Sequence, residues 1–138
     1  MNIVLDTNVL VSALLSPFQA PGRILDLILT GDVNIVFDDR VMAEYRAVLL
    51  RPKFRFDRRS VEELLDECAG TEHFLTAPPS GLDLPDPSDA MFVELAAAAQ
   101  APLVTGNSRH FPSEQCQGIL VMSPAAFLDL WQKGKRDE

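Results

Sequence analysis

The fold of this chain is decided by the stretch Asn2-Ile3-Val4-Leu5-Asp6-Thr7-Asn8. Its first half is a short apolar run, typical of a strand buried in the middle of a parallel sheet. The run ends at once in Asp6, at the carboxyl end of the expected strand, where open α/β sheets place their ligands. A carboxylate at this place indicates a functional site, although Asp6 or Asn8 could also cap the helix that follows.

Strand and helix patterns alternate along the rest of the chain. Apolar runs of strand length occupy residues 33–37, 102–105 and 119–122. Helical patterns occupy residues 9–15, 22–29, from Asp38 or Asp39 to about 50, from a capping box at Ser60 to about 70, 88–99, and onward from Ser123. A further short strand is expected at 72–75, followed by a loop rich in Pro, Gly and Ser over 76–87. The alternation predicts an α/β protein, a three-layer α/β/α sandwich with a central, mainly parallel sheet.

Length and composition bound the class of protein. The chain has 138 residues, which suits one domain spanning 1–138, with a charged tail at 133–138 that we expect to be frayed. No apolar stretch reaches the roughly 20 residues that a membrane helix needs, and no signal peptide is visible. We therefore expect no membrane partner and a cytoplasmic location. The two cysteines, Cys68 and Cys116, indicate neither a zinc site nor a disulfide scaffold.

The charge balance narrows the choice of partners. A formal net charge of −8 argues against broad, unassisted binding to nucleic acid, which depends on neutralising phosphates. It does not exclude a nuclease, because the acids of a metal site are offset by the bound ion. It also leaves room for a basic patch that acts locally.

Four positions at expected strand ends or helix starts carry oxygen ligands: Asp6, Glu44, Asp89 and Asn107. Each has an ordinary explanation as well: a helix start for Asp89, a solvated surface for Glu44, a turn for Asn107. Parallel strands, however, deliver such side chains to one edge of the sheet. Carboxylates held together there repel each other unless a cation neutralises them, and hard oxygen ligands suit Mg²⁺ or Mn²⁺. The set therefore predicts a metal site.

One dense basic stretch lies between two of the expected helices. Residues 51–59 carry five of the twelve Lys and Arg residues, namely Arg51, Lys53, Arg55, Arg58 and Arg59. Cations interleaved with aromatic side chains suit contact with RNA phosphates and bases, although Phe54 and Phe56 could instead fill the core beneath a solvated joint. Arg109 and His110, which follow Asn107, are further candidates for phosphate contact, with an ordinary loop residue as the alternative for His110.

Taken in order, four motifs make the chain resemble the PIN-domain family, of the kind found as the toxin in VapBC-type toxin–antitoxin pairs. The motifs are Ile3-Val4-Leu5-Asp6-Thr7-Asn8, Glu44, Asp86-Pro87-Ser88-Asp89-Ala90-Met91-Phe92 and Leu103-Val104-Thr105-Gly106-Asn107-Ser108-Arg109-His110-Phe111. The resemblance covers essentially the whole chain. It implies a PIN-like fold and a metal-dependent ribonuclease that uses Mg²⁺ or Mn²⁺ to activate water for attack on an RNA phosphodiester.

The resemblance also implies roles for single residues. Asp6, Glu44 and Asp89 would be the catalytic, metal-binding acids, and Asn107 holds the place where the family often has a fourth acid. An asparagine can still ligate through its carbonyl oxygen but carries no charge, so the number of ions is left open. Four residues would give the site polar support: Thr7, Asn8, Asp86 and Thr105.

From the same resemblance we expect an antitoxin protein that covers the site, and a homodimer. Two other classes of protein remain open. One is a PIN-fold interaction module with weak or no nuclease activity, because Asn107 weakens the acid cluster. The other is a phosphate-handling α/β enzyme of another class, but Asn8 stands where a dehalogenase-type phosphatase needs a second Asp. A flavodoxin-like phosphate loop is also missing, since residues 9–16 are mostly apolar.

Overall fold

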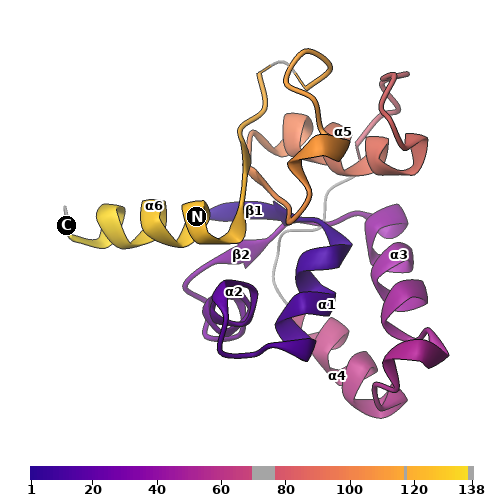
Figure 1. Cartoon of the computed structure of the whole chain (residues 1–138), viewed down its shortest axis with the longest axis vertical. Helices are drawn as coiled ribbons and strands as arrows, with labels where there is room; N and C mark the ends of the chain where they lie inside the picture. Colours follow the sequence, from indigo (N-terminus) through magenta and orange to yellow (C-terminus); the bar gives the residue numbers. More distant parts are fainter. Residues whose placement is uncertain (70–76, 117, 137–138) are drawn as a thin grey trace.

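The computed structural model describes residues 1–69, 77–116 and 118–136 (Figure 1). The short strand that we expected at 72–75 lies outside the described residues. The helices are α1 (Thr7–Leu15), α2 (Ala20–Leu29), α3 (Asp39–Leu49), α4 (Arg58–Ala69), α5 (Ala90–Ala99) and α6 (Pro124–Arg136). Three short 3₁₀ helices connect them, η1 (Pro52–Phe54), η2 (Pro87–Asp89) and η3 (Ser108–His110).

In the described part of the chain four parallel strands form the sheet, in the order β2-β1-β3-β4. They are β1 (Asn2–Leu5), β2 (Asn34–Ile35), β3 (Leu103–Val104) and β4 (Val121–Met122). β1 is central, as its apolar run predicted, and its Leu5 lies opposite Val104. β2 is shorter than the predicted 33–37. Val36 and Phe37 are buried but lie beyond the regular strand. The prediction was too long because an apolar run indicates which residues are buried and not how far strand pairing extends.

Helices cover both faces of the sheet, which confirms the predicted α/β/α arrangement. In Figure 1, α5 lies on one side of β1, and α1, α2, α3 and α4 lie on the other. α6 extends away from the last strand and packs against α2. These four strands run in one direction, so their carboxyl ends lie together at one edge. The loops that leave this edge are the ones that can build a site.

Two helix starts match the sequence and one does not. Asp38 caps α3 by accepting a hydrogen bond from Val41 N (3.0 Å), and Ser123 caps α6 through its hydroxyl. The capping box predicted at Ser60 was wrong. α4 begins at Arg58, and the Asp57 carboxylate accepts hydrogen bonds from both Ser60 N and Ser60 Oγ, each 3.0 Å long. Ser60 therefore lies inside the first turn, where it is held by the true cap.

The last helix reaches into the charged tail. α6 continues to Arg136, so residues 133–136 belong to the helix, whereas residues 137 and 138 lie outside the described part of the chain. An ion pair one turn apart, Lys133 Nζ to Asp129 Oδ2 at 3.0 Å, accompanies this extension. None of the helices in the described residues combines the length and the apolar character that a membrane crossing requires.

A buried tyrosine ties α3 to the end of the central strand. Tyr45 is fully buried, together with Val41, Val48 and Leu49 on the same face of α3, as their spacing predicted. Its hydroxyl donates a hydrogen bond to Leu5 O (2.5 Å), one residue before Asp6. The strand end that carries Asp6 is thus fixed from the α3 side.

We expect the substitution Tyr45→Phe to lower the free energy of unfolding by about 1–2 kcal/mol, because Leu5 O loses a buried hydrogen-bond donor and gains no other. Urea denaturation at neutral pH measures the difference. Equal midpoints and slopes for the two proteins would show that this bond does not stabilise the strand end.

Candidate active site

The site begins where β1 ends. Asp6 follows Leu5, and its backbone N–H donates to Val104 O on neighbouring β3 (2.9 Å). Its side chain is buried, and Asp6 Oδ2 accepts a hydrogen bond from Thr105 Oγ1 (2.7 Å). Asp6 occupies the N-cap position of α1, but its side chain makes no capping hydrogen bond. The hydrogen bond that orients the carboxylate therefore comes from Thr105, at the end of the neighbouring strand.

The loop after β3 is bonded to the same edge. Gly106 N donates to Asn8 Oδ1 (3.3 Å), and Asn107 N donates to Thr105 Oγ1 (3.0 Å). Thr105 Oγ1 therefore accepts one hydrogen bond while it donates another to Asp6, which fixes the orientation of its hydroxyl. The segments 6–8 and 105–107, far apart in the sequence, lie side by side.

A 3₁₀ turn brings the second acid to this edge. Asp86 caps η2 by accepting hydrogen bonds from Ser88 N (3.0 Å) and Ser88 Oγ (2.7 Å), and its carbonyl accepts from Asp89 N (3.0 Å). Asp86 is itself exposed, whereas Asp89 is only 9% exposed, directly ahead of α5. The function of Asp86 in the fold is to shape the turn that presents Asp89.

His110 connects Asp89 with the loop after β3. His110 Nδ1 lies 3.2 Å from Asp89 Oδ2, and His110 Nε2 lies 3.0 Å from Asn107 Nδ2. Nε2 therefore faces the Asn107 amide, and Nδ1 faces Asp89. This contact with Asp89 does not count as a hydrogen bond, so Asp89 Oδ2 has no hydrogen-bond partner among the described residues. The site thus runs from Asp6 through Thr105, Asn107 and His110 to Asp89.

Burial raises the pKa of the Asp6 carboxyl above its ordinary value. The hydrogen bond from Thr105, the backbone N–H groups of Thr7 and Asn8, and the nearby His110 lower it, but they offset only part of the effect. A carboxylate that is kept out of water and incompletely compensated binds a cation more readily than an exposed one.

The pKa of Asp89 is raised further, to about 6. Burial is the largest cause, and the negative charges of Asp6 and Asp86 add to it, while His110 lowers the pKa. Asp86 has the opposite behaviour, because its two hydrogen bonds from Ser88 hold its pKa below the ordinary value. Asp6 and Asp89 therefore form an electrostatically coupled pair of acids, as expected of a functional site.

Buried oxygen atoms without a hydrogen-bond partner also concentrate here. Among the described residues three such side-chain atoms occur, and two of them belong to the predicted site: Thr7 Oγ1 and Asp89 Oδ2. Buried polar atoms are nearly always satisfied, so each exception calls for a ligand or another functional explanation. Asp89 Oδ2 is an atom that a cation could satisfy.

Glu44 is the predicted acid that the structure does not join to the others. It is half-buried on α3, next to Tyr45, and has no hydrogen bond or ion pair with a described residue. Within the described ranges, no three His, Cys, Asp or Glu side chains lie close enough together to hold an ion. Arg109, in η3 beside His110, is exposed, and the cations of residues 51–59 lie on η1 and α4, away from the acid pair.

Sequence reasoning missed a second polar cluster at the same edge of the sheet. Arg40 donates to Asp38 Oδ2 (2.9 Å from Nη2) and to Glu94 Oε1 (2.7 Å from Nη1). Glu94 Oε2 accepts from Ser80 N and Ser80 Oγ, so the cluster ties α3, α5 and the loop before α5 together. The signal was present: Glu94 is the only charged residue in α5, the apolar segment AMFVELAAAA.

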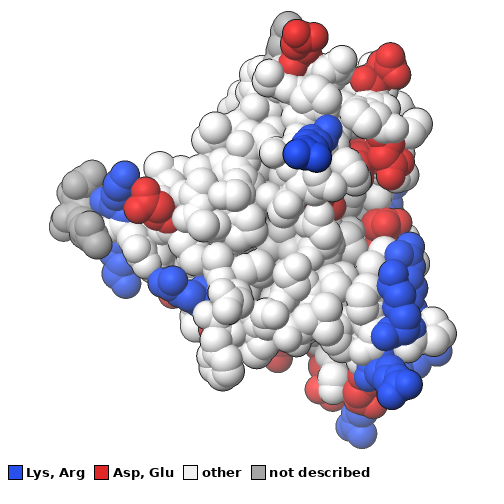
Figure 2. Space-filling model, viewed as in Figure 1, with Lys and Arg blue, Asp and Glu red and all other residues white. Residues whose placement is uncertain are grey.

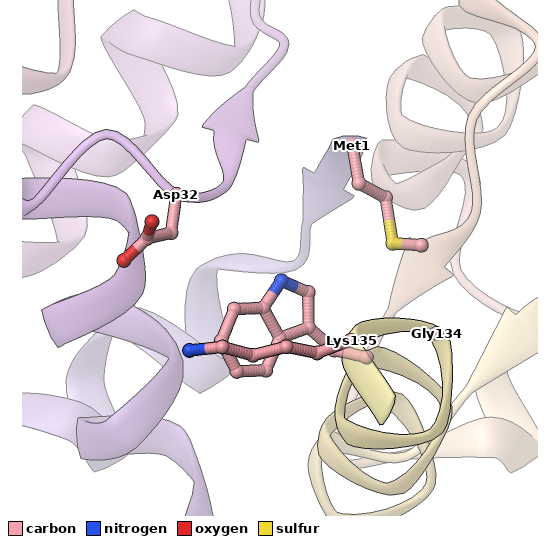
Figure 3. A pocket seen from close by; sticks show the side chains of 5 residues that line it. Met1, Asp32, Gly134 and Lys135 are labelled. Atoms are coloured by element: carbon pink, nitrogen blue, oxygen red, sulfur yellow. The ribbon is translucent and has the colours of Figure 1, made fainter. Parts of the chain in front are cut away.

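A separate hollow of about 350 Å³ lies at the opposite end of the molecule (Figure 3). Met1 and Asp32 line it from just before β1 and β2, and α6 lines it with Trp131, Gly134 and Lys135. Lys135 Nζ lies 5.0 Å from the centre of the Trp131 ring. This hollow faces the amino ends of the strands, so it takes no part in the acid site.

The comparisons with known proteins agree with this architecture. The family model described as PIN domain matches residues 2–109, and the chain belongs to the PIN domain family. Among individual relatives, the uncharacterized protein MJ1680 of Methanocaldococcus jannaschii is 26% identical over 110 residues. The match covers 78% of this chain and 71% of that protein.

Two solved structures share the fold. VapBC2 from Rickettsia felis, bound to a DNA fragment from their promoter, is 18% identical with a TM-score of 0.60, over 89% of this chain and 98% of that chain. FitAcB from Neisseria gonorrhoeae is 22% identical with a TM-score of 0.58, over 89% of this chain and 98% of that chain. At these identities the likeness is one of fold.

Proposed function

We propose that this protein is a Mg²⁺- or Mn²⁺-dependent endoribonuclease, the toxin component of a type II toxin–antitoxin pair. The observation that carries the proposal is the coupled pair Asp6 and Asp89 at one edge of a PIN-domain sheet, with burial and repulsion raising the pKa of Asp89 to about 6. Such a pair gains nothing from packing and is unfavourable until a cation joins it.

The donor set fits a hard divalent ion. Mg²⁺ binds through one or two carboxylates and keeps several waters, which matches two acids, Asp6 and Asp89, and the partnerless Oδ2 of Asp89. Asn107 gives its amide nitrogen to His110, which leaves its carbonyl oxygen as a neutral donor. We propose Glu44 as a further ligand, reached by rotation of its side chain on α3.

The residues around the ion would divide the remaining work. A bound Mg²⁺ or Mn²⁺ would supply the activation of water and the neutralisation of phosphate charge that phosphodiester hydrolysis needs. Thr105 holds the Asp6 carboxylate in one orientation. His110 turns Nδ1 of its ring to Asp89, and Arg109 is exposed beside it, available to an incoming phosphate.

The partners follow from the same proposal. The substrate is RNA, and the protein acts in the cytoplasm. An antitoxin protein covers the acid edge, and two copies of the chain form a homodimer. Similarity of fold to VapBC2, which was solved with promoter DNA, supports an antitoxin partner.

A second candidate is a PIN-fold interaction module with weak or no nuclease activity. Two observations favour it: Asn107 holds a place where the resemblance leads us to expect an acid, and the described residues contain no cluster of three metal-binding side chains. Tight binding of a partner without detectable cleavage would distinguish it from the nuclease.

The test is cleavage of a mixed RNA pool by purified protein with Mg²⁺, with Mn²⁺ and with EDTA. We expect metal-dependent cleavage that falls at least about 100-fold in Asp6→Asn, because the acid supplies preorganised charge at the reacting centre. The control is Asp66→Asn, an equal loss of charge at an exposed position on α4, which should cleave like the unmodified chain. Cleavage that persists in EDTA, or in Asp6→Asn, would contradict the proposal.

A further inference from the structure

The strongest local charge on this acidic protein lies between α3 and α4. Residues 51–59 hold five of the chain's twelve Lys and Arg residues but one of its twenty Asp and Glu residues. We call the five the basic surface: Arg51, Lys53, Arg55, Arg58 and Arg59. Figure 2 shows blue side chains gathered over the far end of α3 and the start of α4, and red ones above them, toward the start of α5.

The cations of the basic surface are exposed and mostly unpaired. All five side chains are exposed. Arg59 lies 3.3 Å from Glu63, in a pair open to solvent that contributes little to stability. The other four have no ion pair among the described residues. Positive charge on this surface is therefore available to an anion from solution.

Three of these cations occupy places that local stability disfavours. Arg58 and Arg59 are the first residues of α4, at the positive end of the helix dipole, where acids are preferred. Arg55 adopts a left-handed backbone conformation, with φ of 56°, which residues other than glycine seldom adopt. Arg55 is the C-cap of η1, whereas the placement of Arg58 and Arg59 brings no such local gain and is of the kind found at functional places.

A stacked aromatic pair anchors the basic surface to the core. The rings of Phe54 and Phe56 stack with centroids 5.5 Å apart, and Lys53 Nζ lies 5.0 Å from the centre of the Phe54 ring. Phe56 packs against the core, so the core-filling interpretation is right for this residue. Phe54 is half-exposed on top of it, and the cations surround it. Cations around an anchored aromatic ring match the way proteins hold single-stranded nucleic acid.

The basic surface is separated from the acid pair by the length of α3. That helix begins beside the carboxyl edge of the sheet and ends next to η1. Its 11 residues span about 16 Å at 1.5 Å per residue. A strand of several nucleotides could therefore contact both places at once, whereas a dinucleotide could not.

We propose that the basic surface binds the backbone of single-stranded RNA several nucleotides away from the acid edge, so that the protein selects extended RNA over short fragments. The inference deepens the proposed ribonuclease function and rests on it for the identity of the ligand. An acidic segment of a protein is the competing ligand, and the experiment includes it.

The experiment measures binding without cleavage. Labelled single-stranded RNAs of about four and about 16 nucleotides are titrated in EDTA by fluorescence anisotropy, at several salt concentrations. The variant Lys53→Gln/Arg55→Gln is compared with the control Arg23→Gln/Lys133→Gln, which removes the same charge from exposed positions on α2 and α6. A second variant, Arg51→Gln/Arg58→Gln, repeats the test at unstrained positions, and circular dichroism verifies that each protein folds.

We expect both basic-surface variants to bind the long RNA about 10-fold more weakly, because two phosphate contacts are lost. For the same reason the slope of log K against log salt concentration should be less steep by about 1.4. The control should retain the affinity of the unmodified chain, and the short RNA should bind weakly to all proteins. Equal losses in variants and control, or poly-glutamate binding as tightly as RNA, would overturn the inference. The binding experiment is done in EDTA and does not depend on cleavage. A failure of the nuclease proposal would therefore appear in the cleavage assay alone, and the RNA affinities could still be interpreted.

Discussion

Replacing Asp89 by asparagine is expected to abolish RNA cleavage while it makes the metal-free protein more stable at neutral pH. The carboxylate is buried and faces the charge of Asp6, and both effects raise its pKa from 3.8 to about 6. The folded state therefore disfavours the ionised form that the site requires. Asparagine keeps the shape of the side chain and removes the charge.

The sign and the pH window follow from the raised pKa. Below about pH 4 the carboxyl is protonated in both the folded and the unfolded chain, so it carries no penalty. As the pH rises through 4 to 6 the unfolded chain ionises first, and the folded state loses stability relative to it. Above about pH 6 the loss is complete. Solvent near this edge reduces the effect of the charge. Above about pH 6 we therefore expect the free energy of unfolding of Asp89→Asn to exceed that of the unmodified chain by about 1–2 kcal/mol.

Thermal unfolding in EDTA, at pH 4 and at pH 7.5, together with the RNA cleavage assay, measures both effects. The matched control is Asp86→Asn, three residues away. The pKa of Asp86 is lowered by its hydrogen bonds from Ser88, so its ionised form stabilises the folded state. Asp86→Asn should therefore make the folded protein slightly less stable at pH 7.5. Added Mg²⁺ should raise the melting temperature of the unmodified protein more than that of Asp89→Asn. A variant that is less stable at pH 7.5 than the unmodified chain would show that Asp89 carries no unfavourable charge.

Replacing Arg40 by alanine is expected to be the most destabilising single change considered for this chain. Among the described residues Arg40 is the only cation paired with Asp38 and Glu94, whose side chains are each 5% exposed. Without it two buried carboxylates lose their partner, a change that costs about 3 kcal/mol or more. Burial raises the pKa of Glu94, but its bonds from Ser80 and Arg40 outweigh this and lower it, so its ionised form stabilises the fold.

Urea denaturation of Arg40→Ala at pH 7 measures this loss. The control is Arg46→Ala on the same helix, whose pair with Glu62 is half-exposed and should contribute less than about 1 kcal/mol. Because the pKa of Glu94 is lowered, the difference between Arg40→Ala and the unmodified chain should shrink as the pH falls through the acidic range. Equal effects of the two alanine variants would mean that the Arg40 cluster is no stronger than a surface pair.

The parts of the site that the sequence predicted are those that depend on strand ends. Asp6 and Thr105 follow apolar runs, and the carboxyl ends of parallel strands lie at the same edge of a sheet, so the two side chains are expected to meet there. The contact between Asp89 and His110 was beyond sequence reasoning, because it depends on how two 3₁₀ turns fold over that edge. The start of α4 was misread for a related reason: both Asp57 and Ser60 can cap a helix, and only the backbone decides between them.

The wide sequence separation within the site has a consequence for how the protein is made. The hydrogen bond between Thr105 and Asp6 joins residues 99 positions apart, and Asn107 and His110 follow still later. A ribosome must therefore deliver the chain beyond His110 before this edge can assemble. Fragments that stop before residue 105 contain the first acid without its companions, so interrupted translation before that point leaves no assembled acid edge.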